Sequence, residues 1–426
     1  EVPFKKVWKD DLEKFIKRDR NHPSVYLWSV GNEVPQQLGD FDKKFETKGD
    51  AADFGAALLR EMVEFTHSID PSREVTAALF PAREGTQTEW TNWNNHAEFM
   101  QTMPPPMAFQ MDVVSWNYTG NLFGVDHKNY PQMKFVASEA STNLDFGNRK
   151  ISMLEFDREH VIGHYYWTAL TYLGESSWPS KSWQRAFFDA NEQMTPIGYL
   201  YKSLYSDEPM VKIEVKEPDT TKLNYWDKQY PNKRWSWYPM LDHWNFEKDA
   251  KLEVQAFSNC DEVELILNDI SLGSKKIKEG EEPVLYWNVP YQKGMLVAVG
   301  KQNGKVVTKD TLKTSGKPKK IVLTPHTKSL KANGGDLVYI QVSLQDKNGN
   351  IVPVDKLISF KVEGAATIAG VANSNEFSDE PWQNNKRTTV NGKCLIVLRT
   401  TNDNGKIEIT ANTKGVKSTK LELSSK

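Results

Sequence analysis

Hydrophobic and polar residues follow two different rhythms in the first half of the chain. Between Phe4 and Arg20 the apolar side chains recur at helical spacing and the residues between them are almost all charged, which predicts an amphipathic helix. The run Val25–Val30 is short, continuously apolar and rich in β-forming residues, as in a buried parallel strand. A second helix is expected at about residues 51–69, ending at Asp70-Pro71.

Further strands are predicted before residue 206. They are expected at Val75–Phe80, Asp112–Tyr118, Lys134–Glu139 and His164–Leu170, with a last helix near residues 194–205. Strands that alternate with helices build a parallel sheet with crossover connections. The five predicted strands would be strands 4 to 8 of a (β/α)8 TIM barrel. The first three strands would precede residue 1, because the chain opens on a helix.

The pattern changes after Asp207. Segments such as Val211–Val215 and Leu252–Phe257 alternate apolar and polar residues and are separated by turn signals, which is typical of an antiparallel β-sandwich. The segment Lys313–Pro318 is polar and contains Gly and Pro, as expected of a hinge, and the alternation resumes at Leu337–Leu344. We therefore expect a barrel part at residues 1–206 and two Ig-like β-sandwich domains at residues 207–315 and 316–426.

Composition narrows the class of partner. The 54 basic and 56 acidic side chains leave a formal charge of −2, too little to attract nucleic acid or an anionic membrane surface. No apolar run is long enough to insert into a membrane. The 14 Trp and 15 Tyr suit the binding of neutral sugars, although large cores use the same residues. The two cysteines, Cys260 and Cys394, fall in different predicted domains, so buried, unpaired thiols are expected.

Two glutamates directly follow predicted strands. Active-site residues of β/α barrels lie at the carboxyl ends of the strands, which is where Glu33 and Glu139 stand. Their separation in sequence is about three βα units of roughly 35 residues each. Glycoside hydrolysis needs one carboxylic acid and a second carboxylate, and such a pair supplies both. Taken alone, each glutamate is better explained by a salt bridge or a loop cap at the rim of the barrel, and it is the pair that favours catalysis.

The segments around these residues resemble a known family. Arg18–Ser24 followed by Val25–Glu33 is similar to the acid/base segment of glycoside hydrolase family 2, which contains β-galactosidases, β-glucuronidases and β-mannosidases. The resemblance continues through Asp112–Tyr118, Phe135–Ala140 and Gly163–Glu175, and less specifically through the predicted sandwiches. It implies a retaining exo-β-glycosidase, with β-galactosidase as the favoured activity, acting on an oligosaccharide or glycoconjugate.

The resemblance also implies a role for each carboxylate. Carried over residue by residue, it makes Glu33 the general acid/base and Glu139 the nucleophile that forms a glycosyl-enzyme. In retaining enzymes the two carboxyl groups lie about 5–5.5 Å apart, against roughly 6.5–9.5 Å in inverting enzymes.

Four further residues are implied to bind substrate. Asn32 matches the residue that hydrogen-bonds the sugar 2-hydroxyl, and Tyr118 matches the tyrosine that steadies the nucleophile. Trp167 matches the aromatic platform of the last strand, and Glu175 lies on the loop that follows. The plainer alternatives are a turn-forming Asn, a sheet aromatic, a core Trp and a solvated carboxylate.

Cofactors and sugar preference are less constrained. No metal or other cofactor is expected from this chain, although some relatives hold Mg²⁺ near the acid/base through residues that would precede Glu1. Glucuronides are disfavoured because Gly174–Lys181 lacks the Asn-x-Lys element with which such relatives hold the sugar carboxylate. Mannose, fucose and arabinose stay open, as does assembly into a homo-oligomer. The family favours a periplasmic or secreted location.

A hypothesis from another class is a non-catalytic carbohydrate-binding or scaffold fragment. A sheet with five of eight barrel strands would have two open edges, which would require a partner segment.

Overall fold

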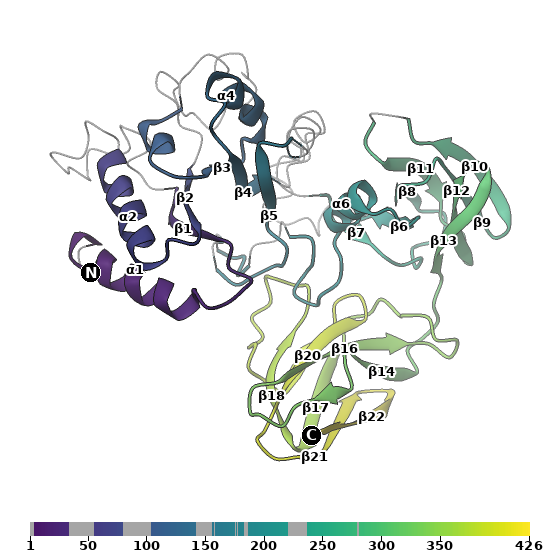
Figure 1. Ribbon diagram of the computed structural model, residues 1–426. Coiled ribbons are helices and arrows are strands. Elements are labelled where there is room, and N and C mark those ends of the chain that lie inside the picture. Colours follow the sequence, from purple (N-terminus) through teal and green to yellow (C-terminus); the bar gives the residue numbers. More distant parts are fainter. Residues whose placement is uncertain are drawn as a thin grey trace. The chain divides into compact units, whose positions relative to one another are not determined.

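The computed structural model describes residues 4–33, 55–79, 104–141, 156, 158–174, 176, 178–182, 186–219, 237–278 and 281–426. The chain divides into two compact units, Glu1–Trp167 and Thr168–Lys426 (Figure 1). The first unit holds one hydrophobic core and the second holds two. Within the described ranges, no helix has the length and apolar character that a membrane span requires. The predicted domain ranges 1–206, 207–315 and 316–426 stay a prediction.

The first unit is built on a parallel sheet with the strand order β1-β2-β3-β4-β5, in which each strand pairs in parallel with its neighbours in sequence. The strands are β1 (Leu27–Asn32), β2 (Glu74–Leu79), β3 (Val114–Asn117), β4 (Phe135–Ser141) and β5 (Val161–Trp167). Spatial order equals sequence order, as in successive βα units of a barrel. The predicted barrel part is confirmed.

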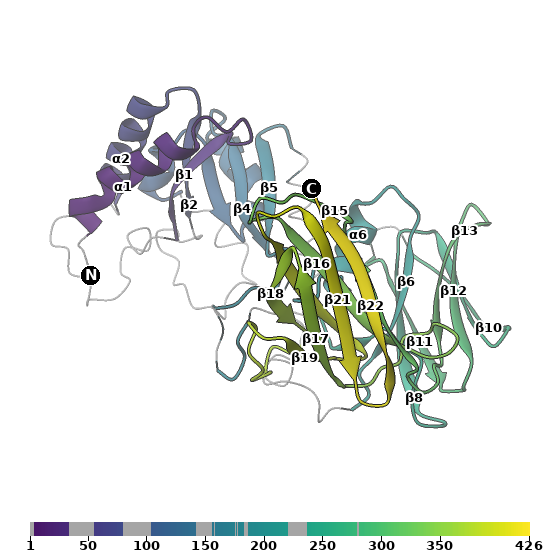
Figure 2. The same ribbon diagram turned by 90° about the horizontal axis from the view of Figure 1, so that it is seen from below.

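Helices cover one face of this sheet. Helix α1 (Phe4–Asp19) contacts α2 (Ala56–Ile69), and α2 lies against β1 and β2 (Figures 1 and 2). The shorter elements are η2 (Pro106–Phe109), η3 (Gly120–Leu122) and α4 (Phe123–Asn129). The apolar stripe of α1 contributes Ile16 to the core, where Trp28 and Trp116 of the sheet are also buried. The amphipathic pattern at Phe4–Arg20 was therefore a correct guide to the buried side of α1.

The sheet is curved. The hydroxyl groups of Tyr26, just before β1, and Tyr165, on β5, form a hydrogen bond. In a flat sheet four strand spacings of about 4.8 Å would separate these outer strands by about 19 Å, more than two tyrosine side chains span. The strands must therefore bend toward each other, as barrel strands do.

The last strand begins and ends three residues earlier than the predicted His164–Leu170. Its register is set by β4, in which Phe135 pairs with Val161 and Ser141 pairs with Trp167. Leu170 lies beyond this ladder, is exposed and makes an isolated bridge to Phe188. Apolar character alone did not reveal where pairing with β4 stops.

A buried ion pair fixes the amino-terminal edge of the sheet. Asp70, at the end of α2, accepts hydrogen bonds from Trp28 Nε1 at 3.0 Å and from Arg73 at 2.7 Å, and Arg73 also donates to the carbonyl of Val25 at 2.6 Å. Burial by itself raises the pKa of Asp70, but the hydrogen bonds from Ser72, Trp28 and Arg73 outweigh it and leave the pKa well below its usual range. The charged pair thus ties α2 to β1.

Helix α6 (Pro196–Tyr205) belongs to the second unit. Its first turn is capped by the Thr195 hydroxyl, which accepts a hydrogen bond from the Gly198 amide. Two four-stranded sheets follow, with the orders β11-β8-β6-β7 and β10-β9-β12-β13. Their strands are β6 (Val211–Lys216), β7 (Met240–Leu241), β8 (Lys251–Ser258), β9 (Glu262–Leu267), β10 (Ile270–Lys276), β11 (Val284–Pro290), β12 (Met295–Gln302) and β13 (Lys305–Lys313). A core that includes Val254, Leu265 and Trp287 lies between the sheets.

The second sandwich contains the remaining strands, in the order β18-β20-β16-β14-β22-β21-β17-β19 with β15 beside β22 (Figure 2). They are β14 (Lys320–Pro325), β15 (Ser329–Leu330), β16 (Leu337–Gln345), β17 (Leu357–Gly364), β18 (Ala366–Ala372), β19 (Lys386–Thr388), β20 (Lys393–Thr400), β21 (Gly405–Thr413) and β22 (Val416–Ser425). In β16, alternate residues are buried, as the sequence pattern predicted. The two predicted β-sandwiches are confirmed.

The predicted hinge at Lys313–Pro318 is held on both sides. Asn245 of the first sandwich accepts a hydrogen bond from the Ser315 amide at 2.9 Å, and Asp346 of the second sandwich accepts one from the Gly316 amide, also at 2.9 Å. Burial alone would raise the pKa of Asp346, but donors that include the Gly316 and Asn350 amides lower it to about 2. The connection is therefore anchored by side-chain acceptors from both domains.

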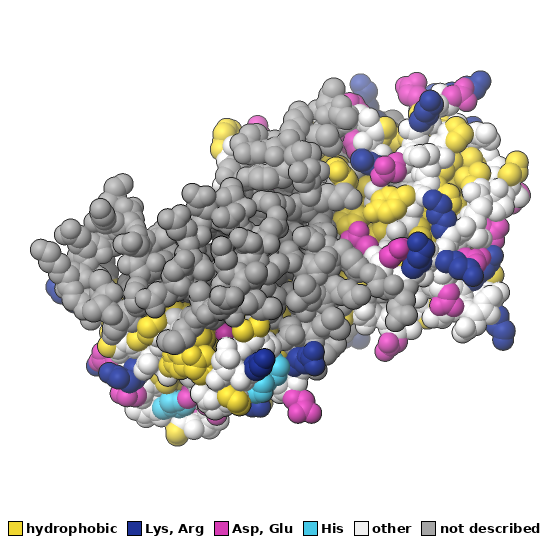
Figure 3. All heavy atoms as spheres, turned by 90° about the horizontal axis from the view of Figure 1, so that it is seen from above, with side chains coloured by type: hydrophobic (Ala, Val, Ile, Leu, Met, Phe, Trp, Pro, Cys, Tyr) yellow, Lys and Arg dark blue, Asp and Glu magenta, His cyan; other side chains and the backbone are white. Residues whose placement is uncertain are grey.

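Cys260 and Cys394 are both buried and unpaired, as predicted, and burial raises the pKa of the Cys394 thiol to about 12. Charged side chains of both signs are interspersed over the described surface seen in Figure 3, in keeping with the formal charge of −2.

Candidate active site

The carboxyl ends of β1, β3 and β4 gather the polar residues of the first unit. Glu33 directly follows β1, Asn117 ends β3, and Glu139 lies within the last three residues of β4. Because parallel strands point the same way, these ends share one edge of the sheet. The register pairs Asn117 with Glu139, and the Glu33 amide donates to the Ala78 carbonyl of β2 at 2.8 Å.

Asn117 joins β1 to β3 through its side chain. Its Nδ2 group donates to Glu33 Oε1 at 2.8 Å and to Asn32 Oδ1 at 3.2 Å. Its Oδ1 atom accepts from the Ser138 hydroxyl at 2.5 Å, and Ser138 accepts from the Ser115 hydroxyl at 2.5 Å. Asn117 and Ser115 are both fully buried, so the centre of this network is shielded from solvent. Asn32 is exposed, and Glu33 and Ser138 are partly exposed.

Tyr118 joins β3 to β4 in a second way. Its hydroxyl donates a hydrogen bond to Glu139 Oε2, and its amide donates to the Glu139 carbonyl at 2.6 Å. A phenol that donates to a carboxylate makes a charge-assisted hydrogen bond, which is shorter and stronger than a neutral one. Glu139 is thus held by its backbone and by its carboxylate.

Two of these residues have an unusual backbone conformation. Glu33 has φ 46° and Tyr118 has φ 64°, which is the left-handed region that non-glycine residues rarely adopt. Such residues cost of order 1–3 kcal/mol each and gather at functional sites. Here the left-handed residue is the first one after the strand in both cases, so each side chain leaves the strand direction at the edge of the sheet.

The structure therefore brings four of the predicted residues together at the end of β3: Asn117 donates to Asn32 and Glu33, and the next residue, Tyr118, donates to Glu139. Trp167 ends β5 at the same edge, where it pairs in register with Ser141, two residues beyond Glu139. Glu175 lies outside the described residues. The group rests on residues from three strands that are distant in sequence.

Sequence reasoning missed Asn117, Ser138 and Ser115. The rule that selected Glu33 and Glu139, a polar residue at the end of an apolar strand, also selects Asn117, the last residue of β3. Nothing in the sequence pattern indicates the hydroxyl pair, because Ser115 and Ser138 lie within their strands and meet only through the register of β3 and β4.

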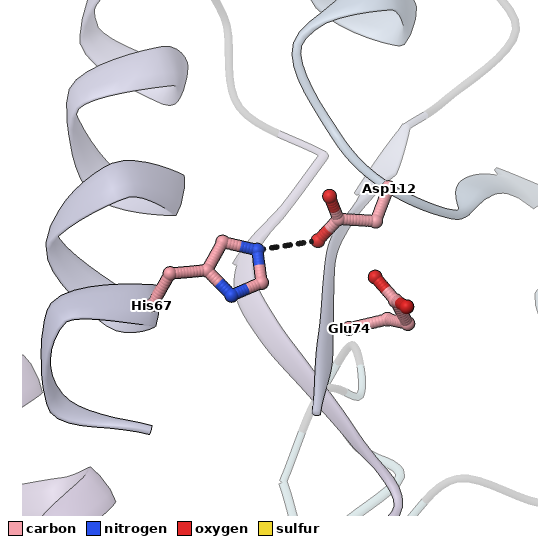
Figure 4. Close-up of side chains that lie close together, drawn as sticks. All are labelled: His67, Glu74 and Asp112. Carbon is pink, nitrogen blue, oxygen red and sulfur yellow. Dashed lines mark hydrogen bonds and ion pairs between the residues drawn. The ribbon is translucent and has the colours of Figure 1, made fainter. Parts of the chain in front are cut away.

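One cluster has the donor set of a metal site. His67, Glu74 and Asp112 offer donor atoms that all lie within 4.8 Å of one another (Figure 4). Glu74 begins β2, so the cluster stands at the amino-terminal edge, opposite the edge with the two glutamates. Asp112 Oδ2 lies 2.8 Å from His67 Nε2 and accepts the Val75 amide at 2.7 Å. Those contacts explain the cluster as a link between α2 and the start of β2.

Comparison with known families identifies the architecture. Residues 3–117 match the glycosyl hydrolases family 2 TIM barrel domain, and residues 321–422 match the glycoside hydrolase family 2 C-terminal domain 5. Residues 249–308 match a domain of unknown function, DUF4982. The first unit and the two sandwiches thus have the domain arrangement of a β/α-barrel part followed by C-terminal β-sandwich domains. The chain belongs to glycoside hydrolase family 2.

Individual relatives agree with this assignment. The β-galactosidase BoGH2A of Bacteroides ovatus is 27% identical over 97% of this chain and 51% of its own length. A putative β-glucuronidase of Formosa agariphila is 25% identical over 93% of this chain and 38% of its own length. A crystal structure of a family 2 member from Bacteroides cellulosilyticus is 30% identical, with a TM-score of 0.81, over 99% of this chain and 52% of that one. The chain spans about half the length of these relatives or less.

Proposed function

We propose that the complete protein is a retaining exo-β-glycosidase in which Glu33 is the general acid/base and Glu139 is the nucleophile. The observation that supports this most strongly is the way the end of β3 holds both carboxylates. Asn117 donates to Glu33, and the next residue, Tyr118, donates to Glu139. Double displacement needs two carboxylates at the active-site edge of the barrel, and this arrangement offers such a pair.

In the first step Glu139 attacks the anomeric carbon while Glu33 gives its proton to the glycosidic oxygen. The bond to the leaving group breaks, and an ester joins the sugar to Glu139. In the second step Glu33, now a carboxylate, takes a proton from water as the water attacks the same carbon. The ester bond breaks, Glu139 is released, and the configuration of the anomeric carbon is retained.

Three further residues are proposed to bind the sugar. The Asn32 carbonyl accepts from Asn117, so its amide NH₂ is the group oriented to donate to the sugar 2-hydroxyl. Trp167, at the end of β5, offers an aromatic face to the ring. Glu175 is kept as a contact from the loop that follows.

The preferred substrate is proposed to be a terminal β-galactoside of an oligosaccharide or glycoconjugate. The named β-galactosidase from Bacteroides ovatus supports this choice, as does the lack of an Asn-x-Lys element in Gly174–Lys181. A β-glucuronide is the second candidate, because a β-glucuronidase of Formosa agariphila is 28% identical over 95% of the chain. The carboxylate of a glucuronide would need a cationic partner in the site. A galactoside carries no carboxylate and needs no such partner.

The test is hydrolysis of nitrophenyl β-galactoside and nitrophenyl β-glucuronide by the complete protein, with the anomer first released identified by NMR. We expect faster release from the galactoside, and β-galactose as the first product. Release of α-galactose would reject the retaining mechanism. Faster release from the glucuronide would transfer the proposal to the second candidate.

The alternative of a non-catalytic carbohydrate-binding or scaffold fragment has a separate outcome. It requires that the complete protein hydrolyse none of a panel of nitrophenyl glycosides while it still binds glycans. Activity that is lost on Glu139→Gln would exclude it.

A further inference from the structure

Asn117 uses every hydrogen-bonding group of its side chain. A primary amide has two N–H donors and one carbonyl acceptor. The donors go to Glu33 Oε1 and Asn32 Oδ1, at 2.8 and 3.2 Å, and the carbonyl accepts from Ser138 at 2.5 Å. The side chain is fully buried at the end of β3. The side chain is therefore not exposed to bulk water, and these hydrogen bonds lie within the group around Glu33.

The oxygen of Glu33 that Asn117 faces fixes which way the amide lies, and the two serines fit that orientation. Ser138 donates to the carbonyl of Asn117, and its own oxygen accepts from Ser115 at 2.5 Å. Turning the amide over would place its carbonyl oxygen against Asn32 Oδ1 and Glu33 Oε1, which are both acceptors. The Ser138 hydroxyl would also lose the carbonyl to which it now donates. The NH₂ group is therefore locked toward Glu33.

We propose that Asn117 is a positioning residue for the acid/base, one that binds Glu33 through Oε1 and so keeps the transferable proton on Oε2. An N–H donor needs a lone pair on the oxygen it faces, and the carbonyl oxygen of a carboxylic acid accepts better than its hydroxyl oxygen. With Oε1 engaged, the acidic hydrogen is carried by the other oxygen. This inference rests on the proposed role of Glu33.

The expected kinetic consequence is specific to proton transfer. Without Asn117 the Glu33 carboxyl group can rotate and carry its proton on either oxygen, so fewer orientations deliver the proton to the glycosidic oxygen. A poor leaving group such as methoxide needs that proton, whereas dinitrophenolate leaves without it. Damage to the general fold would slow both kinds of substrate alike.

The experiment compares Asn117→Ala, Asn117→Asp and Ser138→Ala in the complete protein. Asn117→Asp keeps the size of the side chain but replaces the NH₂ donor by an acceptor. We expect kcat/KM for a methyl β-galactoside to fall about 100-fold in both Asn117 variants, with the dinitrophenyl galactoside changed on the order of threefold or less in the first step. Ser138→Ala should show the same pattern with a smaller loss.

Thr76→Val is the matched control. Thr76 is also buried in this sheet, on β2, and its hydroxyl donates to the Val113 carbonyl at 2.6 Å. The substitution removes one buried hydrogen bond without touching the group around Glu33. We expect the ratio of the two kcat/KM values to stay at its original level.

The possible results distinguish a failure of the positioning role of Asn117 from a failure of the proposed function. An active protein whose Asn117 variants lose both substrates equally, or neither, would overturn the positioning role and leave the proposed function standing. A complete protein that hydrolyses no glycoside would overturn both. Selective loss of the methyl galactoside in Asn117→Asp, with no such loss in Thr76→Val, would support the inference even if Asn117→Ala failed to fold.

Discussion

Tyr118 donates its phenolic hydrogen to Oε2 of Glu139, and its backbone amide donates to the carbonyl of the same residue. The residue before it, Asn117, donates to Glu33. Two consecutive residues at the end of β3 therefore hold the two carboxylates, one directly after β1 and one in the last three residues of β4. The short strand β3 therefore sets the spacing between Glu33 and Glu139, the proposed acid/base and nucleophile, so the separation of the two groups depends on the register of β3 with β4.

Replacing Tyr118 by Phe tests the nucleophile side of this arrangement. The substitution keeps the ring and removes one charge-assisted hydrogen bond, worth about 1.5–3 kcal/mol. We expect kcat/KM to fall about 10- to 100-fold for good and poor leaving groups alike, because Glu139 attacks in either case. Steady-state kinetics with methyl and dinitrophenyl galactosides measure this. A loss confined to the methyl galactoside would show that Tyr118 acts on proton transfer instead.

The two carboxylates should respond differently to conversion into amides. Glu33→Gln cannot donate the proton, so the first step should slow about 10²- to 10⁴-fold for poor leaving groups and little for activated ones. Glu139→Gln removes the nucleophile, so turnover of every substrate should disappear. Pre-steady-state measurement of nitrophenolate release separates the first step from the second. Equal losses for both kinds of leaving group in Glu33→Gln would remove Glu33 from its role.

Glu214, on β6 of the first sandwich, is expected to make stability depend on pH. Burial raises its pKa from the usual 4.5 to about 8, although Lys212 nearby lowers it in part. A carboxyl group whose pKa is higher in the folded state binds its proton more tightly there. Its contribution to stability is therefore fully present below pH 4.5 and is lost as the pH rises through about 8.

Thermal unfolding of Glu214→Gln at several pH values measures this effect. The amide stays neutral throughout, so the variant should gain melting temperature over the original protein at pH 8 and should show little difference near pH 5. Glu253→Gln, a partly exposed glutamate on the neighbouring strand β8, is the matched substitution. The same gain at both pH values, or an equal gain in Glu253→Gln, would contradict the account of Glu214.

The residues that could be found from the sequence are those whose positions follow from local pattern. Glu33 stands next to an apolar run, and the strand period of Leu337–Leu344 reveals a half-buried sandwich strand without any knowledge of its partners. Trp167 was placed correctly as an aromatic residue of the last strand.

The remainder depends on how strands are paired. Val161 begins β5 because it pairs with Phe135 of β4. The sequence around either residue does not indicate this pairing. The contact of Ser115 with Ser138 likewise exists only because β3 and β4 lie side by side in one register. The position of a hydroxyl across a parallel sheet is a tertiary property, so single-chain periodicity does not contain it.

The most direct test of the central claim is to trap the glycosyl-enzyme and locate its ester. A 2-fluoro galactoside with a dinitrophenolate leaving group slows both steps, and the good leaving group lets the first proceed, so the intermediate accumulates. Digestion and mass spectrometry of the inactivated complete protein should place one fluorogalactosyl group on Glu139, and Tyr118→Phe should be labelled more slowly at the same residue. A label on Glu33 or any other residue, or full inactivation without a covalent adduct, would contradict the assignment.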